Sequence, residues 1–232
     1  MKIAGSTALV TGANRGLGRH LAAQLHDRGA TVFAAARNPA QVDLPGVRPI
    51  RLDVTDAESI IEAAALASDV TLLINNAGSS TGASLLTGRM DDIRLEMDTH
   101  YFGTLAVTRA FAPSLAKADS STVLNVLSAL SWVSFPGVGA YCAAKSAEWS
   151  LTNALRQELA PQKTLVSALH VGYMDTDMAQ DVTEAKSDPA DIARLALDGI
   201  ETDEVEIVAD AISEMVRGAL SGGVSGLYPQ FA

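Results

Sequence analysis

Three residues near the middle of the chain carry side chains that can move a proton. Tyr141 and Lys145 lie four residues apart in the segment Gly-Ala-Tyr-Cys-Ala-Ala-Lys, and Ser128 ends an apolar run thirteen residues before Tyr141. On a helix, positions four residues apart share a face, so the ammonium of Lys145 and the hydroxyl of Tyr141 can serve one reacting atom. The serine hydroxyl can donate a hydrogen bond to the same atom. The trio therefore indicates a proton-transfer site.

Each member of the trio also has an ordinary structural interpretation. Tyr141 can pack at the start of a helix, Lys145 can be a solvated helix residue, and Ser128 can end its strand with a local backbone bond. A Tyr-x-x-x-Lys spacing is short enough to occur by chance, so the rest of the chain has to decide between the two interpretations.

Length and composition restrict the kind of protein that holds this site. The chain has 232 residues, of which 48% are hydrophobic and 19% charged, which suits one α/β domain with a large core. The net charge of −10 argues against general nucleic-acid binding. No segment approaches the ~20 apolar residues of a membrane span, so we expect no membrane insertion. The single cysteine, Cys142, fits a reducing compartment, and we expect a cytoplasmic protein.

Apolar runs alternate with amphipathic stretches along the whole chain. The expected strands cover residues 7–10, 31–36, 47–52, 70–74, 122–127 and 165–169. The expected helices cover residues 16–28, 56–67, 91–115, 140–160, 189–197 and 209–220. This alternation predicts a single α/β domain over residues 1–232, with a doubly wound parallel β-sheet flanked by helices on both faces.

Two longer loops and one tail complete the predicted organisation. The loops at residues 79–90 and 172–188 both follow strands, at the edge of the sheet where ligands bind in such folds. We expect residues 172–188 to form a loop on the substrate side. The glycine- and serine-rich residues from 221 onward predict a mobile C-terminal tail over residues 221–232.

A glycine loop follows the first expected strand and opens into a helix, with the sequence Thr-Gly-Ala-Asn-Arg-Gly-Leu-Gly over residues 11–18. Gly12 allows the sharp turn, and Gly16 and Gly18 remove side chains where a pyrophosphate must approach the backbone and the helix N-terminus. The alternative is a tight turn without a ligand. Residues 1–60 hold seven Lys and Arg against five Asp and Glu, which suits an anionic ligand in this acidic chain.

Taken in order, four motifs resemble those of the short-chain dehydrogenase/reductase family. They are the glycine loop, Asn75-Asn76-Ala77-Gly78 after the fourth strand, Ser128, and Tyr141-x-x-x-Lys145. The resemblance covers nearly the whole chain and fades in the last thirty residues. It implies a single-domain Rossmann fold, a nicotinamide cofactor, and redox chemistry between carbonyls and alcohols.

The end of the second strand indicates which nicotinamide cofactor the chain prefers. An NAD site places a carboxylate here for the ribose 2′-hydroxyl, whereas an NADP site places a guanidinium for the 2′-phosphate. Ala36 provides no carboxylate, Arg37 provides the cation, and Arg15 offers a second one. Two solvated surface arginines are the alternative. We therefore expect NADP(H) in preference to NAD(H).

The resemblance also assigns contacts residue by residue. It places Asp53 and Val54 at the adenine, the 76–78 backbone along the cofactor channel, and Met174 and Thr176 at the carboxamide. The complete cofactor set that it implies is Gly12, Asn14, Arg15, Gly16, Leu17, Gly18, Arg37, Asp53, Val54, Asn76, Ala77, Gly78, Tyr141, Lys145, Gly172, Met174 and Thr176. The histidines show no metal-ligand spacing, so we expect no metal.

One position departs from the family pattern. The family usually places Asn three residues before a helix glycine, where it helps to hold a water molecule in a proton relay, and here His100 precedes Gly103 at that spacing. A neutral imidazole has one donor and one acceptor and can still hold a water molecule, but it is bulkier and titrates near neutrality. A packing role for His100 is the alternative to a relay role.

The expected function is an NADPH-dependent oxidoreductase that interconverts a hydrophobic ketone or aldehyde and its alcohol. The expected substrate pocket is formed by Ser128, Trp132, Phe135, Tyr173 and Met178, although each apolar member can equally belong to the core. The alternatives are an NADP-binding regulatory protein with little turnover and an NAD-dependent alcohol dehydrogenase. Residues 103–115 and 149–159 are apolar on more than one side, and together with the resemblance they indicate a homodimer or homotetramer.

Overall fold

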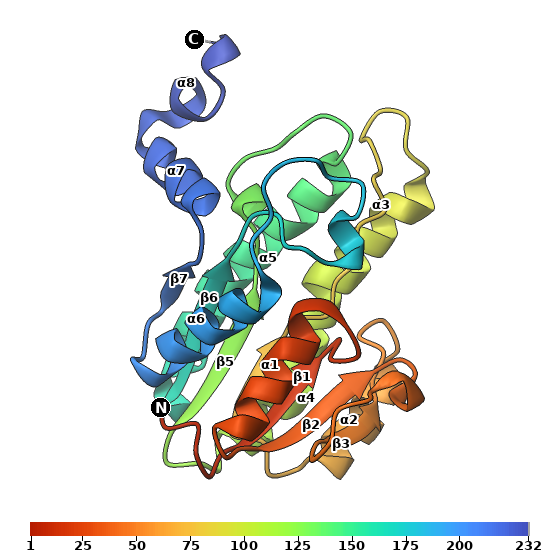
Figure 1. The fold of residues 1–232 in the computed structure, drawn as a ribbon, viewed down its shortest axis with the longest axis vertical. Helices are drawn as coiled ribbons and strands as arrows, with labels where there is room; N and C mark the ends of the chain where they lie inside the picture. Colours follow the sequence, from red (N-terminus) through yellow and green to blue (C-terminus); the bar gives the residue numbers. More distant parts are fainter. Residues whose placement is uncertain (232) are drawn as a thin grey trace.

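The computed structural model describes residues 1–231, in which seven strands form one parallel sheet (Figure 1). The strand order is β3-β2-β1-β4-β5-β6-β7, so the direction of winding reverses between β1 and β4. The strands are β1 (Thr7–Thr11), β2 (Thr31–Ala36), β3 (Arg48–Arg51), β4 (Leu72–Asn75), β5 (Ser121–Val126), β6 (Thr164–His170) and β7 (Glu206–Val208). The predicted doubly wound α/β fold is confirmed.

Helices connect the strands and cover both faces of the sheet (Figure 1). They are α1 (Gly16–Asp27), α2 (Ala57–Leu66), α3 (Met90–Met97), α4 (Thr104–Leu115), α5 (Gly139–Glu158), α6 (Pro189–Glu201), α7 (Ala211–Ala219) and α8 (Gly223–Leu227). No helix within residues 1–231 is both long enough and apolar enough to cross a membrane.

The central strands are buried on both faces, which explains their nearly continuous apolar sequences. In β1, Ala8 and Val10 pack on one side with α1 and α6, whereas Leu9 packs on the other side with α2, α4 and α5. Successive side chains of a strand point to opposite faces, so one short run of sequence supplies both cores.

A buried polar network joins the two middle strands to the helices that cover them. Asn75 at the end of β4 donates to Asn125 Oδ1 in β5 at 2.8 Å and to Thr108 Oγ1 in α4 at 3.1 Å. Asn125 in turn donates to Thr152 Oγ1 in α5 at 2.9 Å. Because buried polar groups need partners, these bonds fix how α4 and α5 lie against the sheet.

The helix predicted over residues 91–115 is interrupted. Residues 98–103 form a π-helical turn, labelled η2 (Asp98–Gly103), between α3 and α4. Such turns widen a helix by one residue and occur often at functional sites. The turn carries His100, and the side chain of His100 is buried. The apolar periodicity of this segment gave no sign of the interruption.

The C-terminal region also differs from the prediction. Strand β7 was not predicted, since its three residues are too few for a periodic signal. Residues 220–231 form short helical turns, including α8, and Tyr228 accepts a hydrogen bond from the Ser134 backbone N–H at 2.8 Å. Figure 1 shows α7 and α8 extending away from the sheet beyond β7. Ala232, the last residue of the predicted tail, lies outside the described residues.

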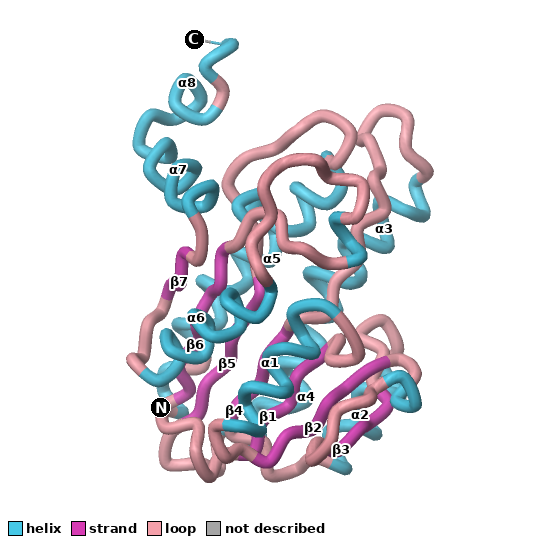
Figure 2. The backbone as a smooth tube through the Cα atoms, viewed as in Figure 1, coloured by secondary structure: helices cyan, strands magenta, loops and turns pink. Residues whose placement is uncertain are grey.

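Several connections leave the carboxyl ends of neighbouring strands and meet at one end of the sheet. They are the glycine loop after β1 and the segments 76–89, 127–138 and 171–188 after β4, β5 and β6 (Figure 2). In a parallel sheet all carboxyl ends lie at the same edge, so residues far apart in sequence are brought together there.

Candidate active site

The glycine loop is held in shape by residues at the end of β4. Gly12 and Gly16 have φ values of +67° and +52°, a region that glycine occupies without a steric penalty. The Thr11 hydroxyl accepts hydrogen bonds from the backbone N–H groups of Asn76 and Ala77, both at 2.9 Å. The Asn76 amide donates to the Thr11 carbonyl at 2.9 Å. Asn76 therefore fixes the loop with its side chain.

Glycine is required at position 18 for a different reason from the one expected. A Cβ atom at this position would lie 2.3 Å from the Gly12 carbonyl oxygen and 2.4 Å from Asn76 Nδ2. The missing side chain of Gly18 therefore lets α1 pack against the loop and β4, whereas the sequence interpretation had it make room for a pyrophosphate.

The N-terminus of α1 offers free hydrogen-bond donors to a ligand. Arg15 occupies the capping position in an extended conformation, and its side chain makes no capping hydrogen bond. The first N–H groups of a helix have no partner within the helix, and they carry the positive end of the helix dipole. This arrangement fits the pyrophosphate that the glycine loop predicts.

The two arginines expected at the 2′-phosphate differ in their surroundings. Arg37 follows β2, is exposed, and has no ion-pair partner among residues 1–231. Arg15 is paired through Nη1 with Asp177 Oδ2 at 2.9 Å, and both side chains are largely exposed. An exposed pair of this kind is weak, so Arg15 remains able to exchange partners.

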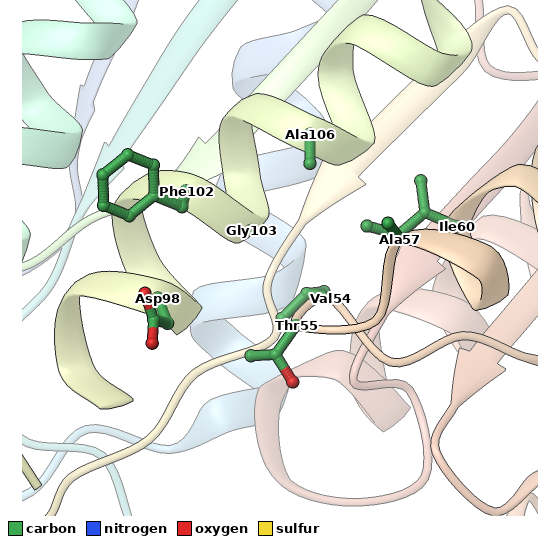
Figure 3. Close-up of a pocket in the computed structure, with 8 residues that line it drawn as sticks. All are labelled: Val54, Thr55, Ala57, Ile60, Asp98, Phe102, Gly103 and Ala106. Carbon is green, nitrogen blue, oxygen red and sulfur yellow. The ribbon is translucent and has the colours of Figure 1, made fainter. Parts of the chain in front are cut away.

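The residues expected near the adenine lie at the turn between β3 and α2. Asp53 Oδ1 accepts from the backbone N–H and the hydroxyl of Thr55, at 3.0 and 2.8 Å. Val54 lines a cavity of about 320 Å³ between this turn and η2 (Figure 3). The other lining residues are Thr55, Ala57, Ile60, Asp98, Phe102, Gly103 and Ala106. Ser128, Tyr141 and Lys145 do not line it, so this cavity is separate from the proton-transfer site.

Ser128, Tyr141 and Lys145 are brought together where β5 ends and α5 begins. Lys145 Nζ donates to the Val126 carbonyl and to Glu148 Oε2, both at 2.7 Å. It lies 5.9 Å from the centroid of the Tyr141 ring. Ser128 Oγ accepts from the Leu130 backbone N–H at 3.1 Å, and its own hydrogen remains available for donation.

The ionisation of Tyr141 is controlled by opposing influences. Burial raises the pKa of Tyr141, the Lys145 charge lowers it, the Glu148 charge raises it, and the Ser128 hydroxyl lowers it. Lys145 therefore acts with the expected sign. The net pKa of Tyr141 is nevertheless raised, because burial outweighs the lysine.

His100 lies directly against Tyr141. The two rings meet edge to face with centroids 5.2 Å apart, and a Cβ atom on Gly78 would lie 2.9 Å from His100 Cε1. His100 Nε2 is 2.9 Å from the Ser79 carbonyl oxygen and 3.3 Å from the Ser79 backbone nitrogen. Nδ1 is buried without a hydrogen-bond partner among the described residues. The bulk of the histidine is accommodated by glycine on the neighbouring loop.

Two buried carboxylates beside this site were not among the predicted residues. Glu148 follows Lys145 by three positions on the buried face of α5, and Glu96 lies on α3. Both are at most 1% exposed. An acidic residue one turn after Lys145 on the same helix face was the available signal for Glu148. Glu96 had no signal, because its burial depends on the loop at residues 79–88.

Glu96 contacts two residues of that loop and His100 of η2. It accepts from Ser79 Oγ at 2.9 Å and from the Thr81 backbone N–H at 2.5 Å, and its Oε2 lies 3.3 Å from His100 Nε2. Burial alone would raise the pKa of Glu96, but hydrogen bonds from His100, Thr81 and Ser79 outweigh it and lower the pKa to about 2.

The residues expected in the substrate pocket divide into two groups. Trp132 is buried and stacks on His170, with ring centroids 3.7 Å apart, so it belongs to the core. Burial lowers the pKa of His170 to about 4. Phe135, Tyr173 and Met178 are 53%, 39% and 50% exposed, and they are therefore accessible to a ligand.

The loop on the substrate side is anchored at both ends. The Gly172 backbone N–H donates to Asp210 Oδ2 at 2.6 Å, and Met174 pairs with Ser187 in an isolated β-bridge. A Cβ atom on Gly16 would lie 3.3 Å from Thr176 Cγ2, so the loop reaches the glycine loop. Tyr173 also borders a cavity of about 160 Å³ with Ala185, Lys186, Ser187, Asp210, Ala211 and Ile212. Residues 1–231 contain no cluster of three or more His, Cys, Asp or Glu side chains suited to a metal ion.

The fold and the glycine loop define a dinucleotide-binding protein of the Rossmann type. A family model described as short chain dehydrogenase matches residues 6–187. This match includes the glycine loop and all three residues of the proton-transfer trio. The chain therefore belongs to the short-chain dehydrogenase/reductase family, as the resemblance implied.

Individual relatives agree with this assignment. A short chain dehydrogenase from Burkholderia cenocepacia J2315, solved in complex with NADP, is 35% identical, covers 99% of this chain and 98% of its own, and superposes with a TM-score of 0.94. L-xylulose reductase of Bos taurus is 32% identical over 91% of this chain and 89% of its own. Carbonyl reductase [NADPH] 2 of Sus scrofa is 31% identical over 82% of this chain and 79% of its own.

The bonds to Glu96 predict a pH-dependent contribution to stability. Its pKa in the folded protein is below its ordinary value of 4.5, so the contribution is present above that value and is lost as the pH falls towards about 2. We expect Glu96→Gln to lower the free energy of unfolding at neutral pH by up to about 3 kcal/mol, since each pKa unit corresponds to about 1.4 kcal/mol. Urea unfolding at several pH values measures the difference.

The difference between the wild type and Glu96→Gln should shrink as the pH falls from 4.5 towards about 2, because in this range the carboxylate is protonated in the unfolded chain while it stays ionised in the folded protein. Glu62→Gln, which alters an exposed carboxylate on α2, serves as the control and should have little effect. A difference for Glu96→Gln that is independent of pH would show that its charge contributes nothing.

Proposed function

We propose that the protein is an NADPH-dependent oxidoreductase that interconverts a hydrophobic ketone or aldehyde and the corresponding alcohol. The observation that carries this proposal is the meeting of Ser128, Tyr141 and Lys145 at the carboxyl edge of the sheet, in a chain whose glycine loop opens at the same edge. Its similarity to an NADP complex and to two reductases supports the same class of reaction.

The residues present fit a bound dinucleotide. The uncapped N-terminus of α1 suits a pyrophosphate, and exposed Arg37 suits a 2′-phosphate. Lys145 has three ammonium hydrogens, of which two are donated to Val126 and Glu148, so one remains for a ribose hydroxyl. When bound, NADPH supplies the hydride for the carbonyl carbon.

The chain itself supplies the proton and its control. Tyr141 gives its phenolic proton to the substrate oxygen on which negative charge develops, and Ser128 donates a hydrogen bond to that oxygen. Lys145 stabilises the tyrosinate that forms, since its charge lowers the pKa of Tyr141. In the direction of alcohol oxidation the same tyrosinate takes up the proton.

Exposed apolar groups on the connections at this edge of the sheet favour a hydrophobic substrate. Phe135 lies on the segment after β5, and Tyr173 and Met178 lie on the loop after β6. Large apolar side chains that remain exposed next to a polar reaction centre commonly mark a ligand site. We further propose that the protein is cytoplasmic and forms a homodimer or homotetramer through residues 103–115 and 149–159.

Two alternatives use the same observations differently. An NADP-binding regulatory protein with little turnover would retain the dinucleotide residues, and His100 is the change in the site that favours it. An NAD-dependent alcohol dehydrogenase would retain the trio but would not need Arg37. The intact trio favours an enzyme over the regulator, and the unpaired Arg37 favours NADPH over NADH.

Loss of the phenolic hydroxyl should abolish most of the turnover. We expect Tyr141→Phe to lower kcat by about 10²- to 10⁴-fold, the range typical of a general acid or base, while NADPH still binds. The assay follows the absorbance of the reduced nicotinamide with a panel of hydrophobic carbonyls. Tyr101→Phe removes the hydroxyl of a half-buried tyrosine on η2 and is the matched control.

Two results would count against the enzyme. Equal turnover by Tyr141→Phe and the wild type would remove Tyr141 from the reaction. Tight binding of NADPH without its consumption on any substrate would favour the regulatory protein.

Reversal of charge at Arg37 should discriminate between the two cofactors. We expect Arg37→Asp to weaken NADPH binding by about ten- to a hundredfold, because charge-assisted hydrogen bonds to the 2′-phosphate are lost, and to change NADH binding much less. Fluorescence titration of both cofactors gives the two Kd values. Arg89→Asp, at an exposed arginine before α3, controls for the change in net charge. Equal weakening for NADPH and NADH would remove the argument for NADPH.

A further inference from the structure

Four ionisable side chains are buried together beneath the proposed active site. They are Glu96, His100, Lys145 and Glu148, with exposed fractions of 0%, 1%, 4% and 1%. They come from three different elements, α3, η2 and α5, so the tertiary fold and not local sequence brings them together. Charged side chains are rarely buried to this extent unless they are paired.

The four side chains form a row that ends at Tyr141. Glu96 Oε2 is 3.3 Å from His100 Nε2, and His100 Nδ1 is 3.8 Å from Glu148 Oε2. The same Glu148 oxygen is 2.7 Å from Lys145 Nζ. The other Glu148 oxygen accepts from the Thr104 hydroxyl at 3.0 Å. Glu148 is thus fixed at both oxygens and lies between the imidazole and the ammonium.

Burying the carboxylate of Glu148 costs free energy that its packing in the core does not offset. Removing a carboxylate from water is unfavourable, and an apolar residue on the buried face of α5 would usually serve the core better. The carboxylate instead restrains the one cation that stands near the reacting phenol. Since Lys145 Nζ is also bonded to Val126, the ammonium is held by two oxygens and keeps one hydrogen for a ligand.

We propose that Glu148 is a positioning residue of the active site, whose carboxylate holds the Lys145 ammonium in place and sets the pH range in which the Tyr141–Lys145 pair gives up its first proton. This inference rests on the proposed function for its catalytic meaning. Its structural part, the coupling of Glu148 to the pair, stands without it.

The direction of the coupling follows from the charges. With Glu148 ionised, the pair must lose a proton beside a negative group, which is unfavourable. Burial lowers the pKa of Lys145, but the neighbouring negative charges, led by Glu148, outweigh burial and raise it. The Glu148 charge also raises the pKa of Tyr141. The two groups interact strongly, so the first proton belongs to the pair rather than to one residue.

Other ionisable groups lie near the same site, and the Glu148 variants leave these residues unchanged. His100 on η2 and Glu96 on α3 lie on the far side of Glu148. His170 on β6 lies behind Ser128, with its Nδ1 3.3 Å from the Ser128 carbonyl oxygen. Cys142 on α5 is buried beside Tyr141, and burial raises the pKa of its thiol.

The first test uses the protein without cofactor and follows the ultraviolet absorbance of tyrosinate as the pH is raised, with Tyr141→Phe subtracted to isolate Tyr141. We expect Glu148→Gln to shift the onset of ionisation to lower pH by about one unit, since the opposing charge is gone. Glu148→Asp retains the charge and should keep the wild-type onset more closely. Identical curves for Glu148→Gln and the wild type would overturn the proposal, whether or not the protein turns over any substrate.

The second test is the pH profile of turnover. In the direction of carbonyl reduction, the phenol must be protonated, so the loss of kcat at alkaline pH should begin at lower pH in Glu148→Gln than in the wild type. A residue with a purely structural role would lower kcat or stability without moving the profile. If no carbonyl is turned over, the proposed function fails while the absorbance test still decides the coupling.

A milder variant covers the case in which Glu148→Gln does not fold. Thr104→Val removes only the hydroxyl that donates to Glu148 Oε1, so this carboxylate loses one of the two contacts that fix it and holds the Lys145 ammonium less closely. We expect the onset of tyrosinate absorbance to shift in the same direction by a smaller amount. An unchanged onset in folded Thr104→Val, together with a failure of Glu148→Gln to fold, would assign Glu148 to the stability of the fold alone and would overturn the proposal.

Discussion

The ammonium of Lys145 is buried, and this charge constrains everything around it. It is held at 2.7 Å by the last carbonyl of β5 and by Glu148, so α5 must lie against β5 with one particular face inward. The hydrogen bond from Asn125 to Thr152 imposes the same orientation on α5. Asn125 directly precedes Val126 on β5, and Thr152 lies two helical turns after Lys145 on α5. Because α5 is fixed in this way, Tyr141 stands beside Ser128 at the edge of the sheet. The proposed chemistry depends on that single ion pair being well placed.

The parallel sheet brings the dinucleotide-binding loop and the proton-transfer residues to the same edge. The glycine loop follows β1, the Asn76 turn follows β4, and Ser128 follows β5, so three segments that are far apart in sequence meet at one edge of the sheet. Thr11 and Asn76 join the first two of these segments through hydrogen bonds. A dinucleotide site and a proton-transfer site are therefore neighbours because of strand order.

The sequence predicted what depends on local pattern. Apolar runs and their alternation gave the sheet, and Tyr141, Lys145 and Ser128 were recognised by type and spacing. Contacts between distant segments were not predictable. Glu96 and His100 meet through a π-helical turn that periodicity does not reveal, and glycine is required at position 18 by the close approach of Asn76, 58 residues later in the chain. Trp132 belongs to the core because His170 stacks on it. Such pairs exist only after the chain has folded.

The most direct test of this account is a crystal structure with NADP and a carbonyl ligand bound. We expect the Tyr141 hydroxyl and the Ser128 hydroxyl both to bond the ligand oxygen, with the nicotinamide C4 facing the carbonyl carbon and Lys145 bonded to the ribose. Arg37 should contact the 2′-phosphate. A Tyr141 hydroxyl directed away from the nicotinamide, with Lys145 remote from the ribose, would contradict it.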